Sequence, residues 1–344
     1  MKNNEKKMDI EVQPNASNEL ITSGATNYSN NTNNSIEKNI INSNNPQILF
    51  YPDKNNNNFN LQKQNESVNN KKIFDFEFES NNEYISFAGE YLNEIYTNLL
   101  LDEKELKIKP NMEYMNNQKD INAQMRAILI DWLIEVHYRF KLKNETLFQT
   151  VWIIDTYLSY RQITRAKLQL LGIASLLISC KSQEIYYPQT KEFINITDGA
   201  YVKNELIEME NNVLKVLNFN IVSPTSNDFY NIISKAFNFD KIQFYLGKYF
   251  LESSLVDYQM LKYSPSVIAV SCAYIVMKFF GINNYKILYS NDVIRVESPQ
   301  KIIKDAAREI CFLVKNLSQS SLKAVKEKYS LSQFLNVVQF CEQK

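Results

Sequence analysis

Apolar residues recur at helical spacing along most of the chain after about Tyr84. In a helix of 3.6 residues per turn, positions three and four apart share a face, so this spacing indicates amphipathic helices. It predicts one helix over residues 84 to 100, and five more between about Asn122 and Leu217. These five are separated by short polar breaks, which read KLKNE, SYRQIT, YYPQT and NITDGA.

The helical pattern is interrupted at IVSPTSND and then returns. Pro224 and the capping residues around it are typical of a helix boundary. A second helical block runs from Phe229 to about Phe340, and its segment SVIAVSCAYIVMKFF resembles LGIASLLISCKSQEIY of the first block. Two similar units of five helices in tandem are the simplest explanation of this likeness.

We therefore predict an all-α protein with four regions. Residues 84–120 form a leading helix and linker, residues 121–220 the first helical unit, and residues 225–340 the second. Residues 1–75 consist largely of Asn, Ser and Lys, with runs such as NNTNNS and KNNNNFN. Such a segment has too little apolar surface to offset the entropy lost on ordering, so we expect a disordered Asn-rich tail.

Four charged residues interrupt the apolar faces of the first helical unit. Arg126, Asp155 and Glu210 each fall within an apolar face, and Lys181 closes the helix that is rich in small residues. A lone buried charge is costly, so each of them needs a partner. We favour pairing Arg126 with Asp155 and Lys181 with Glu210. The alternative is that the long side chains reach outward to solvent and no pair forms.

The helix that contains Arg126 has more apolar surface than one face requires. Its second stripe and the acids beside it are Met125, Ile128, Trp132, Val136, Asp131 and Glu135. An apolar stripe with an acidic rim suits a short peptide that bears a basic residue and a bulky aliphatic one. Apolar stripes more often pack into a core, however, so spacing alone leaves both interpretations open and favours the core.

Composition narrows the classes of partner. The chain has 38 basic and 38 acidic side chains, so broad attraction to nucleic acid or to anionic lipid has no support. The longest apolar stretch, from Val267 to Met277, is shorter than the roughly 20 residues of a membrane span. We therefore expect neither nucleic acid nor a membrane as a partner. Four widely spaced cysteines indicate a reducing compartment.

The sequence also lacks the residue patterns of common active sites. The chain has a single histidine, His137, and six glycines, with no GxxxxGK[ST] or GxGxxG loop. We interpret His137 as a helix-surface residue and expect no catalytic group, no cofactor and no metal. A site made of carboxylates alone stays open as an alternative.

Five segments, in order, resemble the two cyclin boxes of mitotic A/B-type cyclins: MRAILIDWLIEV, NETLFQTVWIIDTYLS, KLQLLGIASLLISCK, ITDGAYVKNELIEMENNVLKVLNF and YSPSVIAVSCAYIV. The resemblance covers about residues 85 to 335. It implies two tandem five-helix boxes and a non-catalytic subunit that forms a heterodimer with a cyclin-dependent protein kinase and activates it. It also implies a G2/M-like role in cell-cycle progression and a location in nucleus and cytoplasm.

The resemblance further implies roles for single residues. Arg126, Asp155, Lys181 and Glu210 match the family's charged box residues, and the latter pair resembles the one that holds the kinase-binding loop. The expected kinase-binding residues are Tyr91, Ile95, Lys181, Ser182, Gln183, Glu184, Ile185, Tyr186 and Glu210. The expected docking patch, for substrates or inhibitors with an Arg-x-Leu motif, comprises Met125, Ile128, Leu129, Trp132, Glu135, Leu168 and Gln169.

One departure from the family pattern keeps a second hypothesis open. Ser182 and Gln183 stand where the family usually has an aromatic residue and an acid. A buried aromatic ring contributes on the order of 150–250 Å² of contact, so kinase affinity or kinase choice is expected to differ. The second hypothesis is a cyclin-box interaction or scaffold protein that binds partners without activating a kinase. The complete charged set and the docking patch favour activation.

Overall fold

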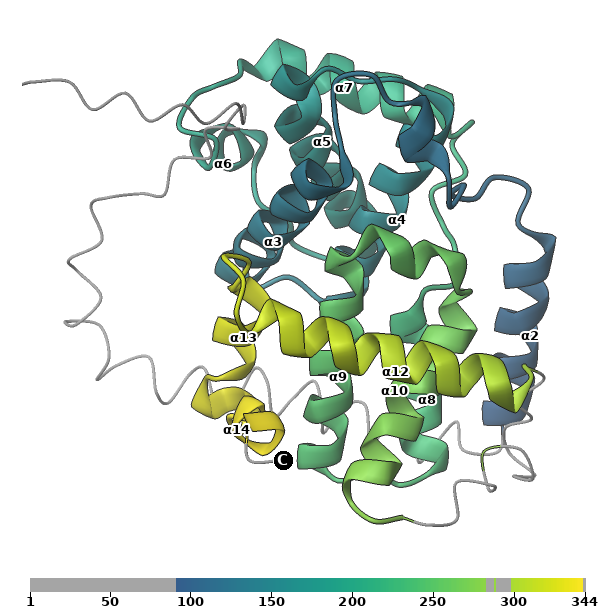
Figure 1. Cartoon of the computed structure of the whole chain (residues 1–344). Helices are drawn as coiled ribbons and strands as arrows, with labels where there is room; N and C mark the ends of the chain where they lie inside the picture. Colours follow the sequence, from purple (N-terminus) through teal and green to yellow (C-terminus); the bar gives the residue numbers. More distant parts are fainter. Residues whose placement is uncertain (1–90, 283–287, 289–297, 343–344) are drawn as a thin grey trace, which may run out of the picture. The chain divides into compact units, whose positions relative to one another are not determined.

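The structure is a computed structural model that describes residues 91–282, 288 and 298–342. All of these residues belong to one compact unit of the chain, Gln47–Lys344. Within the described ranges every regular element is helical, so the predicted all-α class is confirmed there (Figure 1). The predicted Asn-rich tail and the first residues of the predicted leading helix lie outside the described residues.

The leading helix, α2, spans Leu92–Glu105 and continues past its predicted end near Leu100. The extension LDEKE contains good helix formers, and the next helix-breaking residue is Pro110. Helix α2 packs against α8 (Ser226–Ala236), where the rings of Tyr96 and Phe229 meet edge to face at 5.7 Å. A single turn of 3-10 helix, η2 (Tyr114–Asn117), follows.

The first helical unit contains the five predicted helices. They are α3 (Ala123–Arg139), α4 (Asn144–Tyr160), α5 (Arg165–Gln183), α6 (Thr190–Asn195) and α7 (Lys203–Val216). Helix α5 lies at the centre, because it is buried from Leu170 to Cys180 and packs against α3, α4 and α7. Gly172 permits the close crossing with α3, since a Cβ there would lie 2.8 Å from Leu129 Cδ1.

The second unit repeats this arrangement. Its described elements after α8 are α9 (Lys241–Val256), η3 (Tyr258–Lys262), α10 (Pro265–Phe279), α12 (Gln300–Leu317), α13 (Ala324–Tyr329), η4 (Ser332–Phe334) and α14 (Val338–Glu342). Helix α10 is the predicted small-residue helix, and like α5 it is central, packing against α8, α9 and α12 (Figure 1). Its start is fixed by Ser264, whose side chain caps the helix, and by Pro265 in the first turn.

The second unit covers part of α3, and this contact corrects two expectations. His137 is not on the surface: it is 2% exposed, its Nε2 lies 2.8 Å from the Lys143 carbonyl oxygen, and burial lowers its pKa to about 4. Asp131 is not a free rim acid: it is buried and accepts the backbone N–H of Ala324 at 3.1 Å. Both corrections have one cause, because α13 packs on α3 although Asp131 and Ala324 are 193 residues apart in sequence.

Candidate functional site

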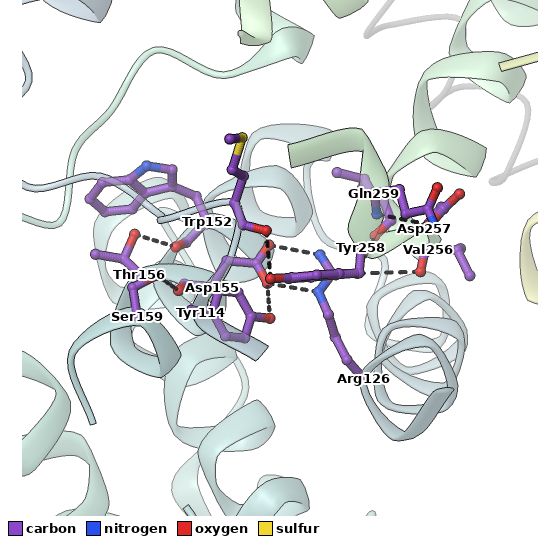
Figure 2. A network of polar contacts seen from close by, with 12 residues as sticks. Tyr114, Arg126, Trp152, Asp155, Thr156, Ser159, Val256, Asp257, Tyr258 and Gln259 are labelled. Atoms are coloured by element: carbon purple, nitrogen blue, oxygen red, sulfur yellow. Dashed lines mark hydrogen bonds and ion pairs between the residues drawn. The ribbon is translucent and has the colours of Figure 1, made fainter. Parts of the chain in front are cut away.

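Arg126 and Asp155 form a buried, bidentate ion pair, as the sequence predicts. The Nε and Nη2 groups of Arg126 donate to the two carboxylate oxygens of Asp155, each at 2.7 Å, and both residues are 1% exposed (Figure 2). The Tyr114 hydroxyl donates to the same carboxylate at 2.8 Å. Burial opposes the charge of Arg126, but the attraction and hydrogen bonds of Asp155 outweigh it and raise the pKa of Arg126 overall.

The same arginine joins the two helical units. Its Nη1 group donates to the Leu255 carbonyl oxygen at 2.9 Å and to that of Val256 at 3.3 Å, at the end of α9. Nearby, the Tyr258 hydroxyl donates to the Met112 carbonyl oxygen at 2.6 Å, which ties the linker after α2 to the second unit. Arg126 therefore acts as a structural junction between the first unit, the second unit and the linker around Tyr114 (Figure 2).

Lys181 and Glu210 form the second predicted pair. Lys181 Nζ lies 2.5 Å from Glu210 Oε1, which joins the last turn of α5 to α7. The pair sits closer to solvent than the first one, because the Lys181 side chain is 42% exposed and that of Glu210 is 12% exposed. Breaking it therefore costs less than breaking the pair of Arg126 and Asp155.

The segment after Lys181 is fixed by neighbouring helices. Gln183 Nε2 donates to Gln149 Oε1 at 2.7 Å, and Gln149 Nε2 donates to the Ile221 carbonyl oxygen at 2.8 Å. Glu184 Oε1 accepts the Lys143 backbone N–H at 2.7 Å and the Thr146 hydroxyl at 2.5 Å. Two glutamines and a glutamate thus hold the end of α5 against the start of α4 and the stretch that follows α7.

The residues at the tip of this segment have large apolar side chains that are exposed to solvent. Ile185 is 80% exposed and Tyr186 is 93% exposed. Single exposed apolar side chains are common, but neighbouring ones on a well-held segment make a candidate interaction surface. The geometry is that of a fixed support with an apolar tip.

Two further exposed apolar side chains were not predicted from the sequence. Phe219 and Val222 are 68% and 71% exposed, on the turn that follows α7. Gln149 connects this turn, through Ile221, to the segment that contains Gln183. The sequence NFNIV, directly after a predicted helix, could have indicated exposed apolar residues in a turn. In the structure, Phe219 lies in this turn with a positive φ of 59°.

Tyr91 and Ile95 are exposed on α2, at 50% and 40%. Helix α2 is held by the second unit rather than by the end of α5. Besides the edge-to-face contact of Tyr96 with Phe229, Glu103 accepts the backbone N–H of Ser266 at 2.8 Å and the Ser266 hydroxyl at 2.6 Å. Among the contacts of the described residues, none links Tyr91 or Ile95 to the apolar tip at Ile185.

The expected docking patch divides into a buried floor and a partly exposed surface. Met125, Leu129 and Leu168 are buried, at 6%, 0% and 0% exposure. Ile128, Trp132 and Gln169 are half-buried, and Glu135 is exposed. The residues come from α3 and α5, which pack against each other.

Acidity at the edge of the patch comes from both helical units. Burial, with a smaller contribution from repulsion by Glu327 of α13, raises the pKa of Asp131 to about 6, although backbone hydrogen bonds from Ala324 and Lys323 oppose this shift. Burial likewise raises the pKa of Glu135, with added repulsion from Asp131 and Glu327. Glu327 was not predicted, because nothing in the sequence places α13 beside α3.

No group of three or more His, Cys, Asp or Glu side chains in residues 91–282 and 298–342 is arranged to hold a metal ion. No helix in these same ranges has the length and apolar character needed to cross a membrane.

Comparison with known proteins identifies the two helical units. Residues 94–222 match the family model "Cyclin, N-terminal domain", and residues 224–344 match "Cyclin, C-terminal domain". The chain is 36% identical over 252 residues to G2/mitotic-specific cyclin-B of Hydra vulgaris. The matched region covers 73% of this chain and 68% of that protein. The chain belongs to the cyclin family. Its two helical units are therefore two cyclin boxes.

Two further comparisons bear on type and fold. The chain is 44% identical over 187 residues to cyclin-B2-1 of rice, Oryza sativa subsp. japonica. The matched region covers 54% of this chain and 44% of that protein. The chain thus matches less than half the length of this relative. A viral cyclin from herpesvirus saimiri has the same fold, with a TM-score of 0.56 and 19% identity over 65% of this chain and 96% of that one. The relatives with higher identity are B-type cyclins, which agrees with the mitotic type expected from the motifs.

Proposed function

We propose that this cyclin is the regulatory subunit of a cyclin-dependent Ser/Thr protein kinase and controls a G2/M-like step of the cell cycle. Membership of the cyclin family and the B-type relatives support this function. The cyclin supplies no catalytic group. It stabilises the arrangement in which the kinase's own lysine–glutamate pair and metal-binding residues are correctly placed.

The observation that carries the proposal is the rigidly supported apolar tip. Ile185 and Tyr186 lie almost entirely in solvent, on a segment held by Gln149 and Glu184. Gln149 also binds the turn that carries the exposed Phe219 and Val222. Binding to a rigid surface costs little ordering entropy, so most of the apolar burial contributes to affinity. The kinase surface that covers this tip is expected to be apolar as well.

The experiment measures kinase binding by the full chain and by two variants. Replacing Ile185 and Tyr186 with serine removes the apolar tip without touching the ion pairs, and should weaken binding by at least about tenfold. The matched control is Phe312→Ser, because Phe312 is 67% exposed on α12 of the second box. Equal kinase affinity for both variants and the parent would rule out this surface as the interface.

We also propose that the docking patch recruits substrates or inhibitors with an Arg-x-Leu motif. The leucine would bury against Ile128 and Trp132 over the floor formed by Leu129, and Glu135 would pair with the arginine. Because Asp131 is engaged with α13, Glu135 is the acid of α3 that remains available to the motif. Binding should be modest and should weaken as salt concentration rises.

A second candidate function rests on one observation. Ser182 and Gln183 offer no aromatic ring, and Gln183 is turned toward Gln149 rather than toward a partner. A cyclin-box scaffold that binds partners without activating a kinase would fit this surface. A complex that forms but shows no gain in kinase activity would favour the scaffold. For either function we propose a location in nucleus and cytoplasm, which imaging of a fluorescent fusion tests.

A further inference from the structure

Gln149 lies where three parts of the first cyclin box meet. It belongs to α4 and is 3% exposed, and its side chain reaches both the end of α5 and the stretch that follows α7. Its Oε1 atom accepts the Gln183 amide at 2.7 Å, and its Nε2 group donates to the Ile221 carbonyl oxygen at 2.8 Å. One buried amide therefore connects the segment that carries the apolar tip to the turn that carries Phe219 and Val222.

The orientation of this amide is set by the protein backbone. The Ile221 carbonyl oxygen can only accept a hydrogen bond, so the Nε2 group of Gln149 must face it. The Oε1 atom of Gln149 then faces position 183, where it needs a hydrogen-bond donor. The side-chain amide of Gln183 supplies that donor.

A carboxylate at position 183 could not take the same place. Glutamate has nearly the shape of glutamine, but when ionised it only accepts hydrogen bonds. It would face the Oε1 atom of Gln149, and turning the Gln149 amide over would instead oppose that oxygen to the Ile221 carbonyl. Either orientation leaves two acceptors facing each other at a buried side chain, which is costly. Gln183 departs from the family pattern, which usually has an acid there, and this geometry gives a reason for the departure.

The turn that Gln149 reaches has a backbone conformation that needs support. Phe219 has a positive φ of 59°, which costs energy for a residue with a side chain. Two local hydrogen bonds hold the turn, from the Phe219 N–H to the Leu214 carbonyl oxygen at 2.8 Å and from the Asn220 N–H to that of Leu217 at 2.9 Å. The bond from Gln149 adds the connection to α4, so its loss should loosen this turn before it affects the rest of the fold.

We propose that Gln149 and Gln183 are positioning residues for kinase binding, which hold the apolar tip and the turn after α7 in one fixed relative arrangement. This inference rests on the proposed function, because it concerns the same kinase interface. A kinase that contacts both surfaces binds a preformed arrangement and avoids the entropy cost of bringing them together. The requirement at position 183 is for a hydrogen-bond donor, so the acid that is usual in the family weakens kinase binding by this chain.

The experiment measures affinity by titration calorimetry for the tightest binder in a panel of purified cyclin-dependent kinases. Gln183→Glu removes the donor, and Gln149→Met removes both bonds but keeps the length of the side chain. Each change in the full chain should weaken binding about three- to tenfold, which corresponds to about one hydrogen bond. The double variant should bind no more weakly than Gln149→Met alone, because the acid then opposes no amide oxygen. Kinase activity at saturating cyclin should equal that of the parent, since positioning changes affinity and not the bound complex.

A second measurement needs no kinase. Amide hydrogen exchange of residues 217–223 should be faster in Gln183→Glu and in Gln149→Met than in the parent, with unchanged exchange in α10 of the second box. Gln183 is half-buried, so Gln183→Glu tests the proposal even if Gln149→Met does not fold. The matched control is Gln300→Glu, which makes the same change at an exposed glutamine of α12 and should match the parent in both measurements.

The outcomes separate this inference from the proposed function. Equal kinase affinity of Gln183→Glu and the parent would overturn the inference, and the proposed interface survives if Ile185→Ser, Tyr186→Ser still loses affinity. An effect of Gln183→Glu that is undiminished in the Gln149→Met background would also overturn it, because the charge would then act on the kinase directly. Unchanged hydrogen exchange of the turn in both variants would show that the turn does not depend on Gln149. A parent chain that binds no kinase of the panel would overturn the proposed function and this inference together.

Discussion

Replacing Asp155 with asparagine tests the junction between the two cyclin boxes. The change removes the negative charge but keeps the side chain's size, so Arg126 stays buried at 1% exposure without its counter-charge. Two charge-assisted hydrogen bonds of 2.7 Å are weakened, together with the one from Tyr114. Removing one partner of a buried pair costs about 3–5 kcal/mol. At about 2–4 °C per kcal/mol for a protein of this size, a loss of 4 kcal/mol lowers Tm by about 8–16 °C.

The assay is urea unfolding followed by far-ultraviolet circular dichroism, with Tm measured in parallel. The matched control is Asp120→Asn, which removes an exposed pair with Arg165 at 2.8 Å and should change stability little. The double variant Arg126→Met, Asp155→Leu leaves no unpaired buried charge and should recover part of the loss. Recovery is incomplete because the Tyr114 hydroxyl and the Leu255 carbonyl oxygen lose their partners. A loss below about 1 kcal/mol for Asp155→Asn, or a double variant no more stable than the single one, would refute the reasoning.

Three further predictions concern the proposed surfaces and the acid beside α13. Alanine at Lys181 or Glu210 should weaken kinase binding, measured by titration calorimetry, with a stability loss smaller than that of Asp155→Asn because Lys181 is 42% exposed. In fluorescence titrations of an Arg-x-Leu peptide, Trp132→Ala should abolish binding and Glu135→Ala should weaken it. Both variants should preserve kinase activity on a short substrate without the motif. Burial raises the pKa of Asp131 to about 6, so the native state binds this proton more tightly than the unfolded state, and stability falls as pH rises from about 4 to about 6. Asp131→Asn should remove that component, seen as urea midpoints at pH 4.5 and pH 7.5.

Each of these three predictions has a contradicting result. Kinase affinity equal to that of the parent in both alanine variants at Lys181 and Glu210 would remove the pair from the interface. Docking that persists in both patch variants, or short-substrate activity that is lost with it, would show that the patch is core or kinase interface. A midpoint difference between the two pH values that is the same in Asp131→Asn and in the parent would show that Asp131 titrates normally.

Features that depend on neighbours along one helix, or on complementary charges, could be predicted from the sequence. Periodicity located α3 to α7, and an arginine within an apolar face required a partner such as Asp155, which the structure supplies. Contacts between the two boxes were not predictable, because a helical wheel describes one helix alone. The burial of His137, the bond of Asp131 to Ala324 and the bond of Arg126 to Leu255 all depend on elements of the second box.

The apolar tip shows the same limit in the candidate site. Motif resemblance predicted Ile185 and Tyr186, but it did not indicate Phe219 and Val222, whose exposure depends on how the turn after α7 is held by Gln149. A cavity of about 660 Å³ between the two boxes was not predicted either, since residues from five separate stretches of the chain line it. Surfaces assembled from distant segments require the three-dimensional structure.

Kinase activity distinguishes an activating cyclin from a scaffold. A partner kinase that carries its activating phosphorylation is assayed on a short Ser/Thr-Pro peptide, alone and with saturating full-length cyclin, and the cyclin is assayed alone. We expect no phosphorylation by the cyclin alone and a large increase in kcat/KM for the complex. The Ile185→Ser, Tyr186→Ser variant should lose this increase at equal concentration, and Phe312→Ser should retain it. A purified complex that is no more active than the free kinase would contradict the proposed function.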